Sequence, residues 1–169
     1  MKKNLVLLGM MGVGKSTLAR KLASKYNLKF IDIDSKIELK NSMSIKRIFE
    51  IKGESFFRKN EEEITLEYLN KSNCVIALGG GAFINKKIRD SVLSLSTSIW
   101  LDVSNKVLEK RLINTSKRPL LKKQTLKKEI EKIYNERKKI YKLANYKINC
   151  DKLSLNDAVR KIMDIYESQ

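Results

Sequence analysis

The sequence predicts an α/β fold in which a parallel sheet is covered by helices on both faces. Short apolar runs typical of buried strands alternate with segments whose apolar residues recur at helical spacing, an order typical of parallel sheets. A length of 169 residues and a hydrophobic content of 42% suit one core that needs no disulfide or metal to hold it. We therefore expect a single domain over residues 1–169.

Five apolar runs are expected to form the strands: Leu5–Leu8, Phe30–Ile33, Cys74–Leu78, Ile99–Leu101 and Tyr146–Ile148. Helical spacing predicts helices at Lys15–Tyr26, at Lys106–Leu112 after an N-cap Ser104, and at Leu155–Tyr166 after an N-cap Ser154. Two further helical stretches, Ile45–Ile51 and Ser55–Leu69, lie between the second and third strands. This insertion is longer than a minimal crossover, so we expect it to form an additional lobe.

The formal charge of +17 raises nucleic acid and anionic lipid as alternative partners. The lysines, however, are scattered over expected helix faces and are not interleaved with aromatic residues, which favours a solvated surface that attracts anionic substrates. No apolar stretch approaches the roughly 20 residues that cross a bilayer, and no signal-peptide pattern follows Met1. We expect a cytoplasmic protein that binds neither nucleic acid nor membrane.

The two cysteines, Cys74 and Cys150, lie far apart in the sequence, and the chain contains no histidine. Neither the spacing nor the composition matches the common zinc patterns. We therefore expect both to be reduced thiols packed in strands.

The residues Gly9 to Ser16 read GMMGVGKS, which matches the phosphate-binding pattern GxxxxGK[ST] between an expected strand and an expected helix. Backbone N–H groups from Gly12 to Thr17, a stretch that includes Val13 and Gly14, are expected to wrap the phosphates of a nucleotide. Lys15 is expected to reach the β- and γ-phosphates, and Ser16 to bind Mg²⁺. The motif predicts nucleotide binding but leaves the acceptor open, because GTPases, motor ATPases and metabolite kinases share it.

Asp32-Ile33-Asp34 ends the second expected strand, and strand alternation places both carboxylates on one side. One acid is then expected to hold the magnesium shell and the other to orient a hydroxyl. The alternative is a polar strand end that feeds a helix N-cap.

Arg58 and the run Gly79-Gly80-Gly81 are further candidates, because an arginine binds a carboxylate bidentately and glycines allow a ligand to approach the backbone. Arg118, beside the only proline, lies in a polar stretch, and a mobile flap there would close on transferring phosphates. Arg137 lies inside the helical segment that follows. Taken singly, the arginines are also consistent with surface ion pairs or a plain surface loop, and the glycine run with a plain loop.

Together these elements resemble the shikimate kinases, a branch of the P-loop kinases, over nearly the whole chain. The resemblance rests on six motifs in the same order: the phosphate loop at Gly9–Thr17, Asp32 with Asp34, Phe57 with Arg58, GGGA at Gly79–Ala82, RPLL at Arg118–Leu121, and Arg137 with Tyr141. It implies a three-layer α/β/α P-loop kinase fold with five parallel strands in the order 2-3-1-4-5. It further implies transfer of the γ-phosphoryl of MgATP to the 3-hydroxyl of shikimate.

The same resemblance implies that Asp34, Arg58, Gly80 and Arg137 hold shikimate, with Gly79 and Gly81 beside them and Asp34 as the base. Asp32 would join the shell of one Mg²⁺ ion through water, Lys15 and Arg118 would stabilise the transferred phosphoryl, and Arg111 would lie against the adenine. The substrate lobe would span residues 33–61 and the lid residues 113–125, in a monomer. The chain departs from the family at Lys152 and Leu155, where an arginine and a proline often face the adenine.

Two alternatives remain at this point. A related kinase could act on another acceptor, such as gluconate or a nucleoside monophosphate. A non-enzymatic P-loop module that binds nucleic acid is suggested only by the charge, and it predicts salt-sensitive binding to DNA or RNA.

Overall fold

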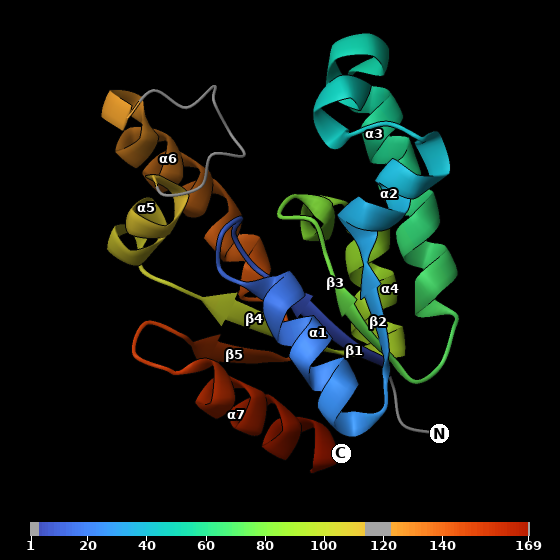
Figure 1. The fold of residues 1–169 in the computed structure, drawn as a ribbon, viewed down its shortest axis with the longest axis vertical. Helices are drawn as coiled ribbons and strands as arrows, with labels where there is room; N and C mark the ends of the chain where they lie inside the picture. Colours follow the sequence, from blue (N-terminus) through green and yellow to red (C-terminus); the bar gives the residue numbers. More distant parts are fainter. Residues whose placement is uncertain (1–3, 114–122, 169) are drawn as a thin grey trace.

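The computed structural model describes residues 4–113 and 123–168, and these form a sheet of five parallel strands between helical layers (Figure 1). The strands are β1 (Asn4–Leu8), β2 (Lys29–Asp32), β3 (Cys74–Ala77), β4 (Ser96–Asp102) and β5 (Tyr146–Asn149). Their order is β2-β3-β1-β4-β5, and every neighbouring pair is parallel. The predicted fold class and strand order are therefore confirmed.

The helices are α1 (Lys15–Tyr26), α2 (Ile33–Asn41), α3 (Ile45–Leu69), α4 (Lys86–Leu95), α5 (Asn105–Ile113), α6 (Lys123–Tyr141) and α7 (Leu155–Glu167), with a short 3-10 helix η1 (Ala82–Ile84). Figure 1 shows α1 and α7 side by side on one face of the sheet and α4 on the other. All five residues of β1 are buried, as expected for a central strand covered on both faces. None of the described helices is long and apolar enough to span a bilayer.

The insertion predicted between β2 and β3 consists of α2 and α3. Figure 1 shows α2 and the first part of α3 beyond the carboxyl end of the sheet, while the rest of α3 runs back beside it. The two predicted stretches of α3 are present and are separated by Gly53, whose φ of 78° and ψ of 171° are not helical. The break falls in the gap between the two predicted stretches, at a residue that adopts positive φ at low cost. Helix α2 was not predicted, since only Ile33 and Ile37 of its nine residues are buried and the apolar pattern is short.

The prediction that Asp32 and Asp34 alternate on a strand is wrong. Strand β2 ends at Asp32, and Asp34 lies in the first turn of α2. The carboxylate of Asp32 is the N-cap of this helix and accepts a hydrogen bond from the backbone N–H of Ser35 at 3.1 Å. The alternative, in which the strand ends at Asp32 and this residue caps a helix, is therefore correct. Both carboxylates still lie at the carboxyl end of the sheet.

The predicted lid, residues 113–125, falls mostly on residues 114–122, which lie outside the described part of the chain together with Arg118. Helix α5 ends at Ile113 and α6 begins at Lys123 on either side of it. The prediction that Ser154 caps α7 is confirmed, because its hydroxyl accepts from the N–H of Asp157 at 3.1 Å.

Candidate active site

The carboxyl ends of the parallel strands gather the loops that carry the predicted motifs. The phosphate loop follows β1, Asp32 ends β2, and the glycine run follows β3. These three strands are neighbours in the sheet, in the order β2-β3-β1, with β2 at the edge and β1 at the centre. Ligands of open parallel sheets bind at this edge, so the topology alone brings the three loops to one place.

The phosphate loop depends on two glycines for its shape. Gly9 has φ 136°, and a Cβ there would lie 2.5 Å from the carbonyl oxygen of Leu101 on β4. Gly14 has φ 97° and forms the left-handed N-cap from which α1 starts. The loop therefore packs against β4 at its start and presents the N-terminus of α1 at its end, which is the geometry of an anion site.

Lys15 is nearly buried within the phosphate loop, with 9% of its surface exposed. Its ammonium group donates hydrogen bonds to the carbonyl oxygens of Gly9 at 2.8 Å and Met10 at 2.9 Å. These contacts hold the cation at the loop that is expected to wrap the phosphates. A nucleotide phosphate that entered the loop would find the positive charge already in place.

Ser16 and Asp32 meet although they are 16 residues apart in the sequence: the hydroxyl of Ser16 donates to Oδ2 of Asp32 at 2.5 Å. A hydroxyl and a carboxylate are the hard oxygen donors that Mg²⁺ prefers. The described residues contain no group of three or more acidic, histidine or cysteine side chains that would hold a metal alone. The chemistry of the pair therefore fits a hard divalent cation.

The glycine run lies at the centre of the other predicted site residues. A Cβ at Gly79 would lie 2.9 Å from Oδ1 of Asp34, one at Gly80 would lie 3.5 Å from Nη1 of Arg137, and one at Gly81 would lie 2.8 Å from Nη1 of Arg58. The absence of side chains is what allows a carboxylate and two guanidinium groups to approach this backbone. The structure thus brings Asp34, Arg58 and Arg137 together around Gly79–Gly81.

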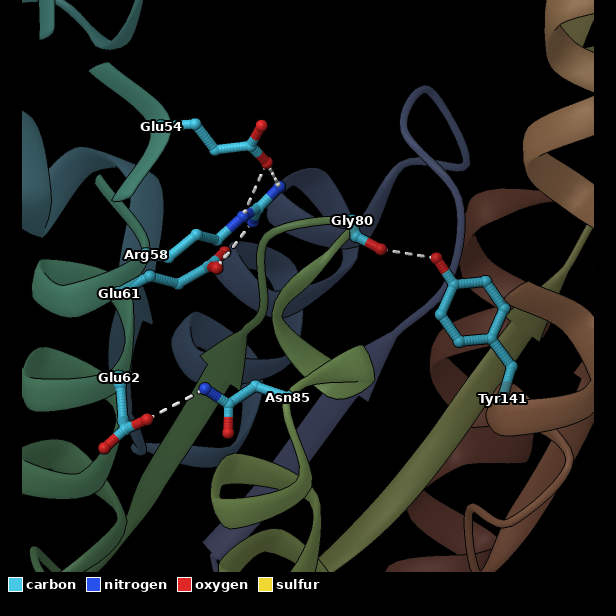
Figure 2. A network of polar contacts seen from close by, with 7 residues as sticks. All are labelled: Glu54, Arg58, Glu61, Glu62, Gly80, Asn85 and Tyr141. Carbon is cyan, nitrogen blue, oxygen red and sulfur yellow. Dashed lines mark hydrogen bonds and ion pairs between the residues drawn. The ribbon is translucent and has the colours of Figure 1, made fainter. Parts of the chain in front are cut away.

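Arg58 is held between two carboxylates on α3, as Figure 2 shows. Its Nη1 donates to Glu61 at 2.6 Å, while Nε and Nη2 both lie 3.2 Å from Oε1 of Glu54. Glu61 was not among the predicted site residues. The available signal was its position three residues after Arg58 on a helix, a spacing at which side chains meet.

Glu61 is a buried carboxylate, with 2% of its side chain exposed. Its Oε1 has no hydrogen-bond partner among the described residues and faces Gly79, where a Cβ would lie 2.6 Å away. Burial raises the pKa of Glu61 above its ordinary value, the hydrogen bond and charge of Arg58 oppose this, and the charge of Asp34 adds to it. The site therefore contains a buried carboxylate whose charge depends on a neighbouring arginine.

Helix α6 contributes Arg137 and Tyr141. Figure 2 shows Tyr141 on the side of Gly80 that is opposite Arg58. The Tyr141 hydroxyl donates to the carbonyl oxygen of Gly80. Burial raises the pKa of this hydroxyl, while the charge and hydrogen bond of Arg137 lower it.

A pocket of about 340 Å³ opens beside the phosphate loop. It is lined by Gly12, Val13, Gly14, Thr17, Leu18, Arg111, Cys150, Leu153, Ser154, Leu155 and Ala158. Arg111 donates from Nη1 to the carbonyl oxygen of Val13 at 3.0 Å, which links α5 to the loop. The position of the pocket next to a phosphate-binding loop suits the base and sugar of a nucleotide. Leu155 supplies an apolar surface in the pocket.

Comparisons with known proteins agree with this geometry. The shikimate kinase family model matches residues 11–167. A shikimate kinase from Sulfurihydrogenibium sp. (strain YO3AOP1) is 44% identical over 161 residues, which cover 95% of this chain and 96% of that protein.

Among solved structures, a shikimate kinase from Acinetobacter baumannii in complex with shikimate superposes with a TM-score of 0.92 at 29% identity, covering 99% of this chain and 94% of that one. A gluconokinase from Sinorhizobium meliloti 1021 has a TM-score of 0.63 at 14% identity, covering 99% and 93%, which is a likeness of fold alone. The family model spans most of the chain, and the relative above 40% identity spans nearly all of it. This chain therefore belongs to the shikimate kinase family and is an enzyme of that family.

Proposed function

We propose that this chain transfers the γ-phosphoryl of ATP to the 3-hydroxyl of shikimate, giving shikimate 3-phosphate and ADP. The observation that supports this most is the convergence of Asp34, Arg58 and Arg137 on the glycine run, next to the phosphate loop. Two guanidinium groups suit the one carboxylate of shikimate, and a carboxylate suits its hydroxyls. Gluconate also carries a carboxylate, so family membership is what favours shikimate as the acceptor.

In this proposal Arg58 and Arg137 bind the shikimate carboxylate and Gly79–Gly81 bring the backbone close to its ring. Asp34 orients the 3-hydroxyl and accepts its proton as the hydroxyl attacks. Holding acceptor and donor in line accounts for most of the catalysis, because phosphoryl transfer needs little covalent assistance from the protein.

The nucleotide side of the reaction is assigned to the phosphate loop and its neighbours. Residues 12–17 bind the phosphates through backbone N–H groups, Lys15 and Arg118 stabilise the transferred phosphoryl, and Arg111 lies beside the adenine. Phosphoryl transfer in kinases uses a divalent metal, which neutralises the charge of the β- and γ-phosphates. We assign it as Mg²⁺, held by Ser16 directly and by Asp32 through water, because both supply hard oxygen donors.

The remaining assignments concern domain organisation, cellular location and oligomeric state. They are one domain over residues 1–169, a substrate lobe at 33–61, a lid at 113–125, and a cytoplasmic monomer. The position of α2 and the first part of α3 beyond the sheet end supports the substrate lobe among these assignments. A lid is needed in such a kinase to exclude water, which would otherwise accept the phosphoryl group.

The proposed reaction is tested by measuring ADP release from MgATP with shikimate, with gluconate and with nucleoside monophosphates in separate assays. Turnover is expected with shikimate alone, together with a product phosphorylated at the 3-hydroxyl by phosphorus NMR. Turnover with gluconate or a nucleotide and none with shikimate would refute the acceptor assignment while leaving the P-loop kinase in place.

A further inference from the structure

Tyr141 is the last residue of α6 and is almost fully buried, with 1% of its surface exposed. Its ring packs against Trp100 of β4, with 5.9 Å between the ring centroids. The hydroxyl at the far end of the ring donates to the carbonyl oxygen of Gly80, 61 residues away in the sequence. A buried tyrosine usually finds a partner for its hydroxyl, and here the partner is the backbone of the glycine run.

This hydrogen bond matters because the glycine run has no side chains with which to hold its own conformation. The described residues contain no cis peptide bond, so the peptide joining Gly80 and Gly81 is trans and planar. Fixing the Gly80 carbonyl towards α6 therefore turns the Gly81 N–H away from α6. Figure 2 shows Gly80 between Tyr141 on one side and Arg58 on the other, and a Cβ at Gly81 would lie 2.8 Å from Arg58.

Arg137 lies on the same helix as Tyr141. The two residues are four positions apart on α6, so their side chains lie on the same face of the helix. Arg137 in turn approaches Gly80, where a Cβ would lie 3.5 Å from its Nη1. The Tyr141 hydroxyl and the Arg137 guanidinium group thus both lie at the Gly80 backbone, which borders the proposed substrate site.

We propose that Tyr141 is a positioning residue for shikimate binding: its hydroxyl fixes the Gly80 peptide against α6, the helix that carries Arg137, so that α6 and the glycine run bind the substrate as a unit. This inference rests on the proposed function of Arg137 and Gly80. It assigns Tyr141 no contact with the reacting atoms.

The test is the Tyr141→Phe variant, which keeps the ring on Trp100 and removes only the hydroxyl. A matched control is Tyr134→Phe on the same helix, whose hydroxyl donates to Oδ1 of Asp102 at 3.0 Å and not to the glycine run. Losing a donor to a buried carbonyl is expected to raise the KM and Kd for shikimate about tenfold in Tyr141→Phe. The KM for ATP is expected to stay unchanged, and Tyr134→Phe is expected to keep both wild-type KM values.

A purely structural role predicts a different pattern, in which both variants lose thermal stability and neither changes shikimate KM selectively. Unchanged shikimate KM in Tyr141→Phe, or an equal rise of both KM values, would overturn the inference. Wild-type protein that fails to bind shikimate would instead refute the proposed function, so the two failures are distinguishable. Should Tyr141→Phe not fold, 3-fluorotyrosine at position 141 keeps the packing and changes the acidity of the donor; a Kd for shikimate equal to wild type would then contradict the inference.

Discussion

Glu61 and Glu62 are consecutive carboxylates on α3 with opposite electrostatic surroundings. Glu61 is buried against Arg58, and burial is the largest influence on its pKa, which is raised. Glu62 is more exposed, pairs with Lys87 at 2.8 Å and accepts from Asn85, and these hydrogen bonds lower its pKa. The two residues therefore contribute to stability with opposite dependence on pH.

The sign follows from proton binding. Folded Glu61 binds its proton more tightly than the unfolded chain does, so its contribution is fully present below its ordinary pKa of 4.5 and is lost as pH rises through the folded pKa. As the pH rises through the folded pKa of Glu61, we expect the free energy of unfolding of the wild type to fall relative to that of Glu61→Gln. Urea unfolding at a series of pH values measures this difference. Glu62→Gln is the control and should show the reverse, since the contribution of Glu62 is lost as pH falls below 4.5. Parallel pH profiles for the two variants would contradict the assignment.

At the scale of an element, the phosphate loop and α3 each depend on a glycine at positive φ, but in different surroundings. A Cβ at Gly9 would clash with the Leu101 carbonyl at 2.5 Å, whereas a Cβ at Gly53 would have no heavy atom within 4 Å. Both positions are strained for any other residue. Only at Gly9 must the loop itself move to make room.

We therefore expect Gly9→Ala to displace the phosphate loop, with a large rise in the KM for ATP and a loss of about 1–3 kcal/mol of stability. Gly53→Ala is the matched control: it should lose about 1–3 kcal/mol from its positive-φ, extended-ψ backbone alone and keep the wild-type KM for ATP. Steady-state kinetics and urea unfolding of both variants give the comparison. An unchanged KM for ATP in Gly9→Ala would show that the loop tolerates the clash.

At the scale of the whole molecule, the two thiols report on folding. Cys74 and Cys150 are both buried free thiols, as predicted. Cys74 lies in a strand, β3, as expected, whereas Cys150 directly follows β5 and lies outside it. Burial raises the pKa of Cys150 to about 11 and that of Cys74 above its ordinary value. Since the thiolate is the reactive form, native protein is expected to react slowly with an aromatic disulfide reagent at mildly alkaline pH.

Both thiols are expected to react rapidly once the chain is unfolded in urea, and saturating MgATP should slow the reaction of Cys150, which lines the pocket beside the phosphate loop. A Cys150→Ala variant separates the two reactions. Fast labelling of native Cys150 would contradict its burial.

The raised pKa of Cys150 also affects the stability of the protein. The contribution of Cys150 to the free energy of unfolding is lost as pH rises from 9.0 towards about 11.

Much of the fold could be predicted because its signals are local. The strands, the phosphate loop and the two parts of α3 each show in a few consecutive residues, and all are present in the structure. The end of β2 was placed at Asp34 in place of Asp32 and α2 was not predicted, because strand alternation and an N-cap at Asp32 are both compatible with this stretch of sequence. Only the tertiary contacts of α2 decide between them.

The sequence by itself predicted nucleotide binding, because glycine, lysine and serine at fixed spacing are what a phosphate loop requires. The order of the six motifs placed the chain among the P-loop kinases. The tertiary structure decided which side chains meet. Ser16 with Asp32, Glu61 with Gly79, and Tyr141 with Gly80 are separated by 16 to 61 residues, and no local pattern relates them. Their contacts follow from strand order and helix packing, which bring distant segments to one edge of the sheet.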